Sequence, residues 1–479
     1  MKLSIKENNL EQVDAHIKFV YEDNIKDDES LKVWVDKEAF GGKDEQIFYF
    51  TNSDASFTIL VGLGKFEDLT KEKFTNAVAK SIKQINKLKA KTYVLNFIQA
   101  KQMCAGEVVT AFAEGVVLAN YTFNKYKSQK DEHTSEGFID GYPQEKKDKI
   151  LEKLEHAINI AHSINFARNL VNEPPCEMYP EVLADIAVKE GQECGFEVEV
   201  FDEHKIQEMK MGAFWAVGKG SDRLPRFIIM RYNGDPENET CMGLVGKGLT
   251  IDTGGYSIKH ATGMEAMKND MSGSATVVGV MRAFALNKVK ANVVAVVAAC
   301  ENTISGGSYK PGDLVTAMNG KTIEVINTDA EGRLTLADAI TYITENEKVD
   351  KVVDIATLTG SVLAALGTNI TGVISNNTEF YNDLEKAGKR TGEKFWRLPN
   401  DDSFKAQIKG DFADIKNSGG PYGGSITAGM FLQEFVGDTP WLHLDIAGTA
   451  WSKSNTDICP KGGTGVGVRT LYHLVVNNK

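Results

Sequence analysis

The octapeptide NTDAEGRL, at residues 327–334, constrains the fold of this chain more than any other segment. It places Asp329, Glu331 and Arg333 at alternate positions. In an extended segment, residues two apart point to the same side, so two carboxylates and a guanidinium would face one point. That arrangement suits a hard or borderline cation better than a hydrophobic core. Taken alone, however, the pattern fits a solvated strand face or a ladder of salt bridges better.

Two earlier segments, at 245–259 and 267–279, add charged side chains among glycines and other small residues. They contribute two lysines and two aspartates: Lys247, Asp252, Lys259 and Asp270. Plain turns are the ordinary alternative for each segment. Four carboxylates gathered in one place would raise one another's pKa, so something positive must hold them together. Two divalent cations would balance about four negative charges by formal charge.

In these segments the chain resembles the leucine (cytosol) aminopeptidases, a family of two-metal exopeptidases. The likeness runs from about Ala167 to the C-terminus, and the octapeptide is its most specific element. Further segments that follow the family pattern are LVNEPP at 170–175, the stretch 301–339, ATLTGS at 356–361, ITAGMFLQEF at 426–435 and WLHLDIAGTAW at 441–451.

The resemblance implies a ligand role for five residues. Asp252 and Glu331 would bridge two divalent metal ions. Asp329 would bind the first ion, and Lys247 and Asp270 the second. A lysine ligand must lose its proton; its reference pKa is about 10.4, and nearby dications and burial both lower it. Without the resemblance, Lys247 is better explained as a charge-balancing ammonium. The ligands are mostly oxygen, so zinc or manganese is expected, and cobalt or magnesium also fits.

The resemblance also implies two catalytic side chains. Lys259 would stabilise the negative oxygen that forms on the scissile carbonyl. Arg333 would hold a bicarbonate ion that accepts a proton from water, because an arginine, with a pKa above about 12, cannot itself be the base. The residues expected around the bicarbonate are Arg333, Ala330, Gly332 and Leu358.

The implied activity is removal of N-terminal residues from peptides, by attack of a hydroxide that bridges the two metals. The free α-amine of the substrate would coordinate a metal, which would restrict cleavage to the first residue. The family's pocket for the first side chain maps onto Met267, Thr357, Gly360, Ala447 and Ala450. These residues are apolar or small and predict a preference for leucine- or methionine-like side chains. On its own, Met267 fits an ordinary core position.

The chain departs from the family pattern at two places. The family usually has D-S-G-G where residues 252–255 are D-T-G-G, and D-M-G-G-A-A where residues 270–275 are D-M-S-G-S-A. The positions that would face the metals are unchanged, and the substituted residues are small. These changes therefore bear on metal preference and substrate range rather than on the presence of a site.

Two other functions are compatible with parts of this pattern. VGKGLT faintly resembles a phosphate loop, but a Walker A motif needs Ser or Thr after its lysine, and Lys247 is followed by Gly248. A dinuclear-metal phosphoesterase stays open on chemistry alone, because two metals also clamp phosphates. A non-catalytic DNA-binding regulator on the same scaffold is the other alternative. The intact metal ligands and the net charge of -12 both argue against a DNA-binding regulator, so nucleic acid is not an expected partner.

The composition is that of a large globular enzyme without membrane segments. The 479 residues predict two or three domains, and 42% of them are hydrophobic. The six cysteines include no C-x-x-C, which predicts free, buried thiols in a reducing compartment. The histidines do not cluster and H-E-x-x-H is absent, which argues against a His-liganded zinc protease. No signal-type stretch or run of about 18 apolar residues is found, so a cytoplasmic location without a membrane span is expected.

The order of apolar runs predicts an α/β fold: a smaller N-terminal α/β domain joined by a long helix to a larger α/β catalytic domain with a central mixed, mostly parallel sheet. The expected boundaries are 1–150 for the N-terminal, macro-like domain, 151–171 for the connecting helix and 172–479 for the catalytic domain. The helix is predicted over about 144–170 from its apolar spacing. The family resemblance implies a homo-hexamer of two stacked trimers.

Individual strands are predicted from continuous apolar runs at 57–64 and 92–98 in the first domain, and at 227–232, 292–299 and 351–356 in the second. The charged segments follow runs of this kind, where open α/β sheets place their sites. The polar stretch 128–149 is predicted to be a loop or linker.

Overall fold

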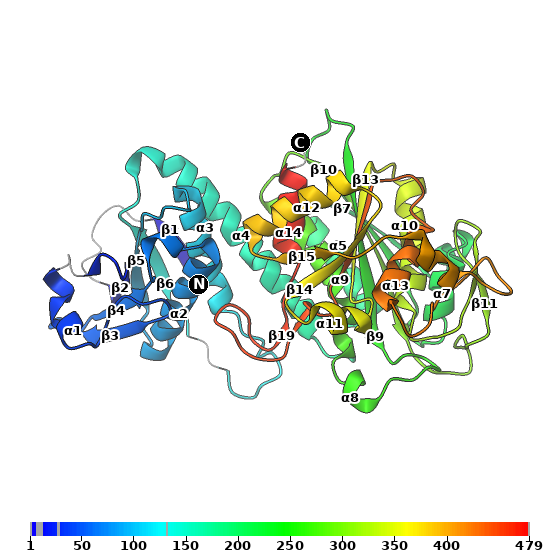
Figure 1. Cartoon of the computed structure of the whole chain (residues 1–479), viewed down its shortest axis with the longest axis horizontal. Helices are drawn as coiled ribbons and strands as arrows, with labels where there is room; N and C mark the ends of the chain where they lie inside the picture. The colour runs from blue at the N-terminus through cyan, green and yellow to red at the C-terminus, as the bar shows by residue number, and fades with distance from the viewer. Residues whose placement is uncertain (1, 6–12, 26–28, 131–132, 478–479) are drawn as a thin grey trace. The chain divides into compact units, whose positions relative to one another are not determined.

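The computed structural model describes residues 2–5, 13–25, 29–130 and 133–477. The chain forms two compact α/β units (Figure 1). The first contains residues 1–162 and 454–461, and the second contains residues 163–453 and 462–479. The division falls inside helix α4 (Lys147–Asn172), which follows a 3-10 turn at Gln144–Lys146. The predicted long helix over 144–170 is therefore confirmed, and so is the two-domain α/β architecture.

The first unit is built on a six-stranded sheet in the order β1-β6-β5-β2-β4-β3. All neighbouring pairs are parallel except β3 with β4. Its strands are β1 (Lys2–Ile5), β2 (Ala15–Val20), β3 (Ile47–Thr51), β4 (Phe57–Gly62), β5 (Thr92–Asn96) and β6 (Glu136–Asp140). Its other helices are α1 (Lys32–Asp36), α2 (Lys71–Leu88) and α3 (Ala105–Ala119), with 3-10 turns at Glu29–Leu31 and Phe66–Asp68. The strands predicted at 57–64 and 92–98 are confirmed as β4 and β5.

Strand β6 shows that the prediction of a loop or linker over 128–149 is wrong for part of that stretch. Residues 136–140 pair in parallel with both β1 and β5. Only three residues of the strand are apolar or small, and Gly137, Phe138 and Ile139 are all buried. A Cβ on Gly137 would lie 2.5 Å from the ring of Tyr93, so glycine permits this close pairing. The strand is too short, and its flanks too polar, to stand out in the sequence.

The second unit is built on an eight-stranded mixed sheet in the order β15-β14-β17-β13-β9-β10-β8-β7. The central pairs β17–β13, β13–β9 and β9–β10 are parallel. The strands are β7 (Glu197–Phe201), β8 (Arg226–Asn233), β9 (Cys241–Asp252), β10 (Asn292–Asn302), β13 (Lys351–Ala356), β14 (Ile370–Ser375), β15 (Lys394–Arg397) and β17 (Trp441–Asp445). Strands β8, β10 and β13 confirm the predictions at 227–232, 292–299 and 351–356.

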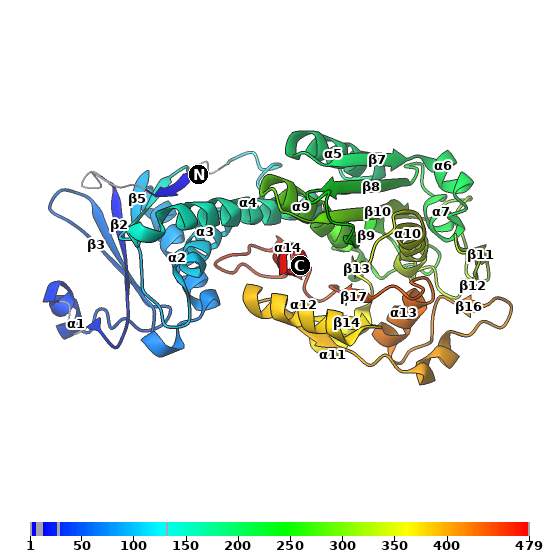
Figure 2. The same ribbon diagram turned by 90° about the horizontal axis from the view of Figure 1, so that it is seen from above.

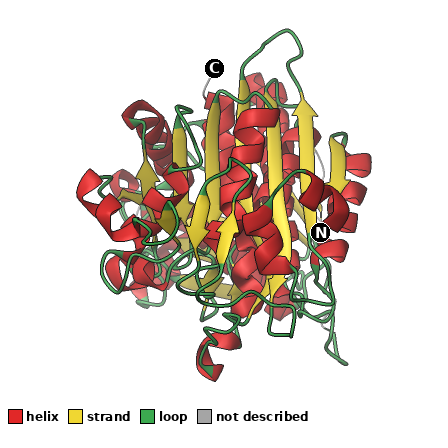
Figure 3. Ribbon diagram, turned by 90° about the vertical axis from the view of Figure 1, so that its right-hand side faces the viewer, coloured by secondary structure: helices red, strands yellow, loops and turns green. Residues whose placement is uncertain are grey.

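Helices cover both faces of this sheet (Figures 2 and 3). One layer consists of α5 (Pro180–Cys194), α9 (Ser272–Leu286), α12 (Thr378–Thr391) and α14 (Val468–Asn477), and the other of α7 (Gly212–Gly218), α10 (Gly332–Asn346) and α13 (Gly424–Gln433). The main core lies largely in the second layer. Both faces of the central strands are therefore buried, which explains their continuous apolar sequences.

Short elements complete the second unit. They are α6 (Glu203–Glu208), α8 (Ala261–Met264), α11 (Gly360–Leu366), the 3-10 helices η5 (Met267–Met271) and η6 (Asp402–Ile408), and the strands β11 (Leu314–Thr316), β12 (Thr322–Glu324), β16 (Ile415–Lys416), β18 (Trp451–Ser452) and β19 (Gly462–Gly463). Within the described residues, none of the helices combines the length and the apolar content that a membrane span requires. All six cysteines are free thiols, but the prediction that they are buried is wrong for Cys104 and Cys176, which are exposed.

Candidate metal centre

The charged residues of the second unit converge beside the carboxyl end of strand β9. Lys247 lies within that strand and Asp252 is its last residue. Both residues therefore belong to a strand, and the alternative of a plain turn is wrong for Lys247. The glycines serve packing instead: a Cβ on Gly246 would lie 2.7 Å from the Cα of Ser274, so the strand approaches helix α9 closely. Asp270 lies in η5, directly before α9.

The octapeptide is a turn followed by a helix, so its predicted extended conformation is wrong. Thr328 and Asp329 form the turn, Glu331 is the N-cap of α10, and Arg333 lies inside the helix. The backbone N–H groups of Leu334 and Thr335 donate to the Glu331 carbonyl. The helical conformation is favoured over the extended one because the apolar residues of α10 are buried at helical spacing against the main core.

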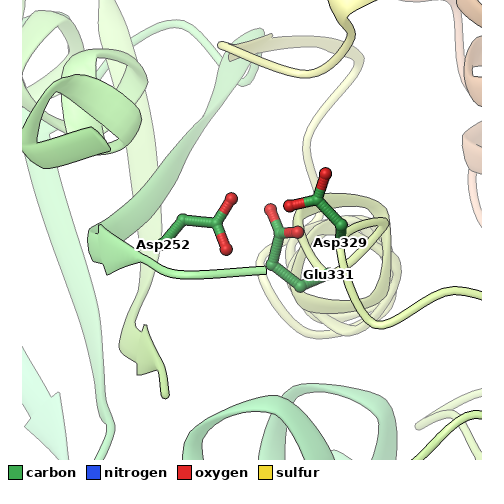
Figure 4. Close-up of side chains that lie close together, drawn as sticks. All are labelled: Asp252, Asp329 and Glu331. Carbon is green, nitrogen blue, oxygen red and sulfur yellow. The ribbon is translucent and has the colours of Figure 1, made fainter. Parts of the chain in front are cut away.

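The two carboxylates of the octapeptide nevertheless meet the end of β9. Asp252, Asp329 and Glu331 each offer a carboxylate oxygen, and these oxygens lie within 4.8 Å of one another. Figure 4 shows the three carboxylates together. Asp252 and Glu331 are buried, whereas Asp329 is partly exposed. Hard cations bind oxygen ligands grouped in this way.

Two lysines link these acids to one another and to Asp270. The Nζ of Lys247 lies 2.7 Å from Asp270 Oδ2 and 2.8 Å from Glu331 Oε1. The Nζ of Lys259 lies 2.8 Å from Asp252 Oδ2 and also pairs with Asp329. The structure thus brings together all five predicted metal ligands and the predicted catalytic lysine. Each lysine bridges acids from two different segments.

One carboxylate oxygen argues directly for a cation. Glu331 Oε2 is buried and has no hydrogen bond within the part of the chain that the structure describes, since the close contact with Lys247 is made by Oε1. A buried carboxylate oxygen without a partner is costly, and a bound cation would satisfy it. The donor set around it, four carboxylates and one amine, fits divalent ions of the zinc or manganese kind.

The electrostatics of the cluster reflect burial and mutual repulsion. Burial raises the pKa of the Asp252 carboxyl to about 6, with Glu331 acting in the same direction and Lys259 against it. Burial alone would lower the pKa of Lys247, but the Asp270 and Glu331 carboxylates raise it above its ordinary value. The side chains by themselves therefore favour an ammonium at Lys247, and only nearby dications would reverse that preference.

Arg333 is buried beneath the cluster. One guanidinium nitrogen, Nη1, donates to the backbone oxygen of Asn417 at 2.8 Å. Burial lowers the pKa of Arg333 to about 10, although Glu331 acts against that change. Gly332 is equally constrained, because a Cβ there would lie 2.4 Å from the side chain of Lys247.

A cavity of about 440 Å³ opens above the acids. Its walls contain the five predicted ligands, Lys259, and the predicted residues Met267, Thr357, Leu358, Gly360 and Ala447. Four other predicted site residues do not line this cavity: Ala330, Gly332, Arg333 and Ala450. Ala450 is buried, with its N–H bonded to the Ile446 carbonyl. Thr357 ties the wall to the acids, since its hydroxyl donates to Asp270 Oδ1 at 2.8 Å.

The sequence analysis assigned no role to several other residues around the site, although some of them lie in stretches that follow the family pattern. Asn302 donates to Asp252 Oδ1 at 2.7 Å and to the Thr328 carbonyl at 3.0 Å. The Asp445 carboxylate accepts from the Thr359 hydroxyl at 2.6 Å and from backbone N–H groups of both cavity loops. The cavity wall also contains Trp451 and Lys453. None of these residues belongs to the charged segments, so only the folded chain shows their proximity.

Comparison with protein-family models covers both units. A model described as the catalytic domain of the cytosol aminopeptidase family matches residues 165–472, and a model described as the N-terminal domain of that family matches residues 20–130. The chain is 47% identical to a probable cytosol aminopeptidase of Clostridium perfringens, over 98% of each chain. It is 45% identical to a probable cytosol aminopeptidase of Clostridium tetani, over 92% of each chain.

Solved structures share the fold. The bottromycin maturation enzyme BotP, in complex with Mn, superimposes with a TM-score of 0.89 at 30% identity, covering 97% of this chain and 99% of BotP. A mutant of tomato leucine aminopeptidase superimposes with a TM-score of 0.89 at 32% identity, covering 100% of this chain and 97% of the tomato chain.

Proposed function

The chain belongs to the cytosol aminopeptidase family, and on that premise we propose that it is a two-metal aminopeptidase that removes N-terminal residues, leucine- or methionine-like ones above all, from peptides. The observation that carries the proposal is the convergence of Asp252, Asp329 and Glu331 at the wall of an open cavity, where one buried oxygen of Glu331 has no hydrogen bond from the described residues. A structural cluster of acids would have no need of a cavity large enough for a side chain.

In the proposed site, Asp252 and Glu331 would be shared by both metal ions, Asp329 would hold the first, and Lys247 and Asp270 would hold the second. Zinc or manganese fits this donor set best, and cobalt or magnesium is compatible with it. The manganese in the BotP complex supports manganese here. When bound, two such ions supply the positive charge that lowers the pKa of water and polarises a carbonyl.

The remaining charged side chains act on the substrate. Lys259 faces the cavity, and although burial lowers its pKa, the Asp252 and Glu331 carboxylates raise it above its ordinary value. It therefore stays an ammonium and can donate to the negative oxygen that develops on the scissile carbonyl. Arg333 also stays charged near neutral pH, and with Ala330, Gly332 and Leu358 it is proposed to hold the bicarbonate that accepts a proton.

The side-chain pocket is proposed to consist of Met267, Thr357, Gly360, Ala447 and Ala450. Four of these line the cavity, and Ala450 lies buried behind it. Leu363 and Trp451 add apolar wall. A lining of this kind supports apolar first residues, because each buried methylene of the substrate contributes about 0.8 kcal/mol.

We further propose a domain division at 1–150, 151–171 and 172–479, with the chemistry confined to the last part. A cytoplasmic location is proposed because the relatives carry "cytosol" in their names. A homo-hexamer is proposed as the working assembly.

The test is hydrolysis of leucine p-nitroanilide by the purified protein. Chelated protein is compared with chelated protein given manganese or zinc, and an N-acetylated substrate is run beside the free amine. Activity that returns with metal and vanishes on acetylation supports the proposal. Failure to release product with any metal, across several first residues, would refute it and leave the phosphoesterase and the non-catalytic regulator to be pursued.

A further inference from the structure

Asn417 is a buried residue that lies against the metal-binding octapeptide. It directly follows β16, the short strand that pairs in parallel with β12. Its side chain is 0% exposed. The backbone N–H of Asn417 donates to the Glu324 carbonyl at 2.9 Å, which extends the pairing by one residue. Strand β16 therefore delivers Asn417 to the segment that leads from β12 into the octapeptide.

The Asn417 side-chain amide is fully engaged by the backbone of that segment. Its Oδ1 accepts from the N–H of Ile326 at 2.8 Å and from the N–H of Asn327 at 3.3 Å. Its Nδ2 donates to the carbonyl of Asn327 at 2.7 Å and to the carbonyl of Ala330 at 3.3 Å. A flipped amide would set donors against donors, so the partners fix its orientation. An amide is the one side-chain group of this size that offers two donors and an acceptor together.

These contacts surround the functional residues. The carbonyls of Asn327 and Ala330 stand on either side of the turn that contains Asp329, and Ala330 directly precedes Glu331. The backbone oxygen of Asn417 accepts from Arg333 Nη1 at 2.8 Å. One buried residue, about 90 positions along the chain, thus contacts the backbone around both carboxylates and one catalytic side chain.

We propose that Asn417 is a positioning residue of the metal centre. Its amide holds the turn in the conformation that presents Asp329 and Glu331, and its carbonyl holds the guanidinium of Arg333. The inference rests on the proposed function, because it assigns to this amide the outer contacts that orient metal ligands. Loss of the two donated hydrogen bonds would remove the Asn417 donor from the buried Ala330 carbonyl, would leave the Asn327 carbonyl with only the Ala330 N–H, and would free the turn to move.

The test uses the full-length chelated protein and two variants, Asn417→Asp and Asn417→Ala. Aspartate keeps the shape and the acceptor but cannot donate when ionised, and alanine removes the whole group. Calorimetric titration with Mn²⁺ is expected to show affinity weakened by about 10- to 100-fold in both variants. The Mn²⁺ concentration that half-saturates hydrolysis should rise by the same factor, and excess Mn²⁺ should restore much of kcat.

Asn287→Asp is the matched control. Asn287 is also a buried asparagine of the second unit, but its amide donates to the Tyr472 hydroxyl at 3.1 Å, away from the cavity wall. The control should titrate with Mn²⁺ like the parent. Thermal unfolding in chelator is measured for every protein, to separate a local effect on ligand geometry from general destabilisation.

Three results would contradict the positioning role of Asn417. Parental Mn²⁺ affinity in Asn417→Asp would overturn the inference while leaving the proposed function in place. Unfolding of both Asn417 variants in chelator would also overturn it, because the amide would then support the fold rather than the site. A parent that binds none of Mn²⁺, Zn²⁺, Co²⁺ and Mg²⁺ would refute the proposed function, and this inference with it.

Discussion

At the residue scale, the site depends on two lysines whose positive charges stabilise a cluster of four carboxylates. Lys247 pairs with Asp270 and Glu331, and Lys259 pairs with Asp252 and Asp329. Each ammonium therefore offsets the repulsion between carboxylates that come from different segments. Cations bound at the same place would compete with both lysines, and Lys247 would have to give up a proton. Metal binding is consequently expected to release protons and to weaken as pH falls.

Replacing Glu331 is the most direct test of the proposed ligand set. Glu331→Ala removes a carboxylate proposed to be shared by both ions and the ion pair of Glu331 with Lys247. We expect turnover to be abolished, a larger loss than the about 10- to 100-fold typical of outer contacts. The fold should remain largely intact, as shown by circular dichroism and thermal unfolding in chelator. Substantial residual hydrolysis of leucine p-nitroanilide would show that the ligand assignment is wrong.

Lys259→Met tests the proposed stabilisation of the carbonyl oxygen. Methionine keeps the length and apolar stem of the side chain but removes its charge. A donor that acts only on developing negative charge should affect kcat, so kcat is expected to fall about 10²- to 10³-fold with KM little changed. Steady-state kinetics at saturating Mn²⁺ provide the measurement. Lys386→Met, which alters an exposed ion pair on α12, is the control. A change confined to KM would instead assign Lys259 to substrate binding.

At the element scale, strand β17 shows how a strand buried on both faces can carry polar side chains. Trp441, His443 and Asp445 alternate along it and therefore share one face. The Asp354 carboxylate of β13 accepts from Trp441 Nε1 at 2.7 Å and lies 2.6 Å from His443 Nδ1. Asp445 follows at the end of the strand, where it fixes the two cavity loops. One face of β17 therefore contributes Trp441 and His443 to the core at the start of the strand and Asp445 to the site at its end.

The His443–Asp354 pair predicts a specific dependence of stability on pH. Burial alone would lower the pKa of His443, but the Asp354 and Asp445 carboxylates together outweigh it and the pKa is raised above 6.5. The folded protein then binds more protons than the unfolded chain between 6.5 and the raised value, so stability falls as pH rises through that window. Relative to His443→Asn, the parent should lose about 1.4 kcal/mol per pH unit there. Denaturant unfolding in chelator, from about pH 6 to about pH 9, measures the difference. A difference that is constant with pH would show that His443 is neutral in the fold.

Elements with a strong local pattern were predictable, and contacts between distant segments were not. The continuous apolar runs of β8, β10 and β13 are visible in the sequence because strands buried on both faces need them. Strand β6 was missed, because its burial comes from pairing with β1 and β5 rather than from its own composition. The octapeptide was predicted to be extended because residue alternation was considered without the apolar residues that follow it.

The candidate site shows the same division. Its charged residues could be named because they lie in three short segments with unusual composition. Asn302, Asn417 and Asp445 could not, since each acts only through contacts across the fold, and a family-like stretch around Asn302 and Asp445 does not by itself single them out. Convergence of the acids themselves required the turn before α10, which no single segment specifies.

At the scale of the whole molecule, the second unit leaves large apolar side chains exposed. Phe412 and Tyr422 are 85% and 82% exposed, and both lie on the segment between η6 and α13 that also contains Asn417. Exposed aromatic residues of this kind are common where protein copies meet. An assembly that covered this segment would also restrain the amide that lies against the octapeptide. Assembly and metal affinity would then be coupled.

The proposed hexamer makes this argument measurable. Light scattering of the purified protein should give a mass of about 315 kDa, six times the 52.5 kDa of one chain. If the contacts between chains are of the obligate kind, the mass should stay the same on dilution. The affinity for Mn²⁺ should also stay the same at every concentration at which the hexamer is intact. Phe412→Ser combined with Tyr422→Ser is expected to reduce the mass and, because the segment is then freed, to weaken Mn²⁺ binding. A monomeric parent with full aminopeptidase activity would refute the hexamer. Smaller species of the double variant that bind Mn²⁺ like the parent would show that the site is complete within one chain.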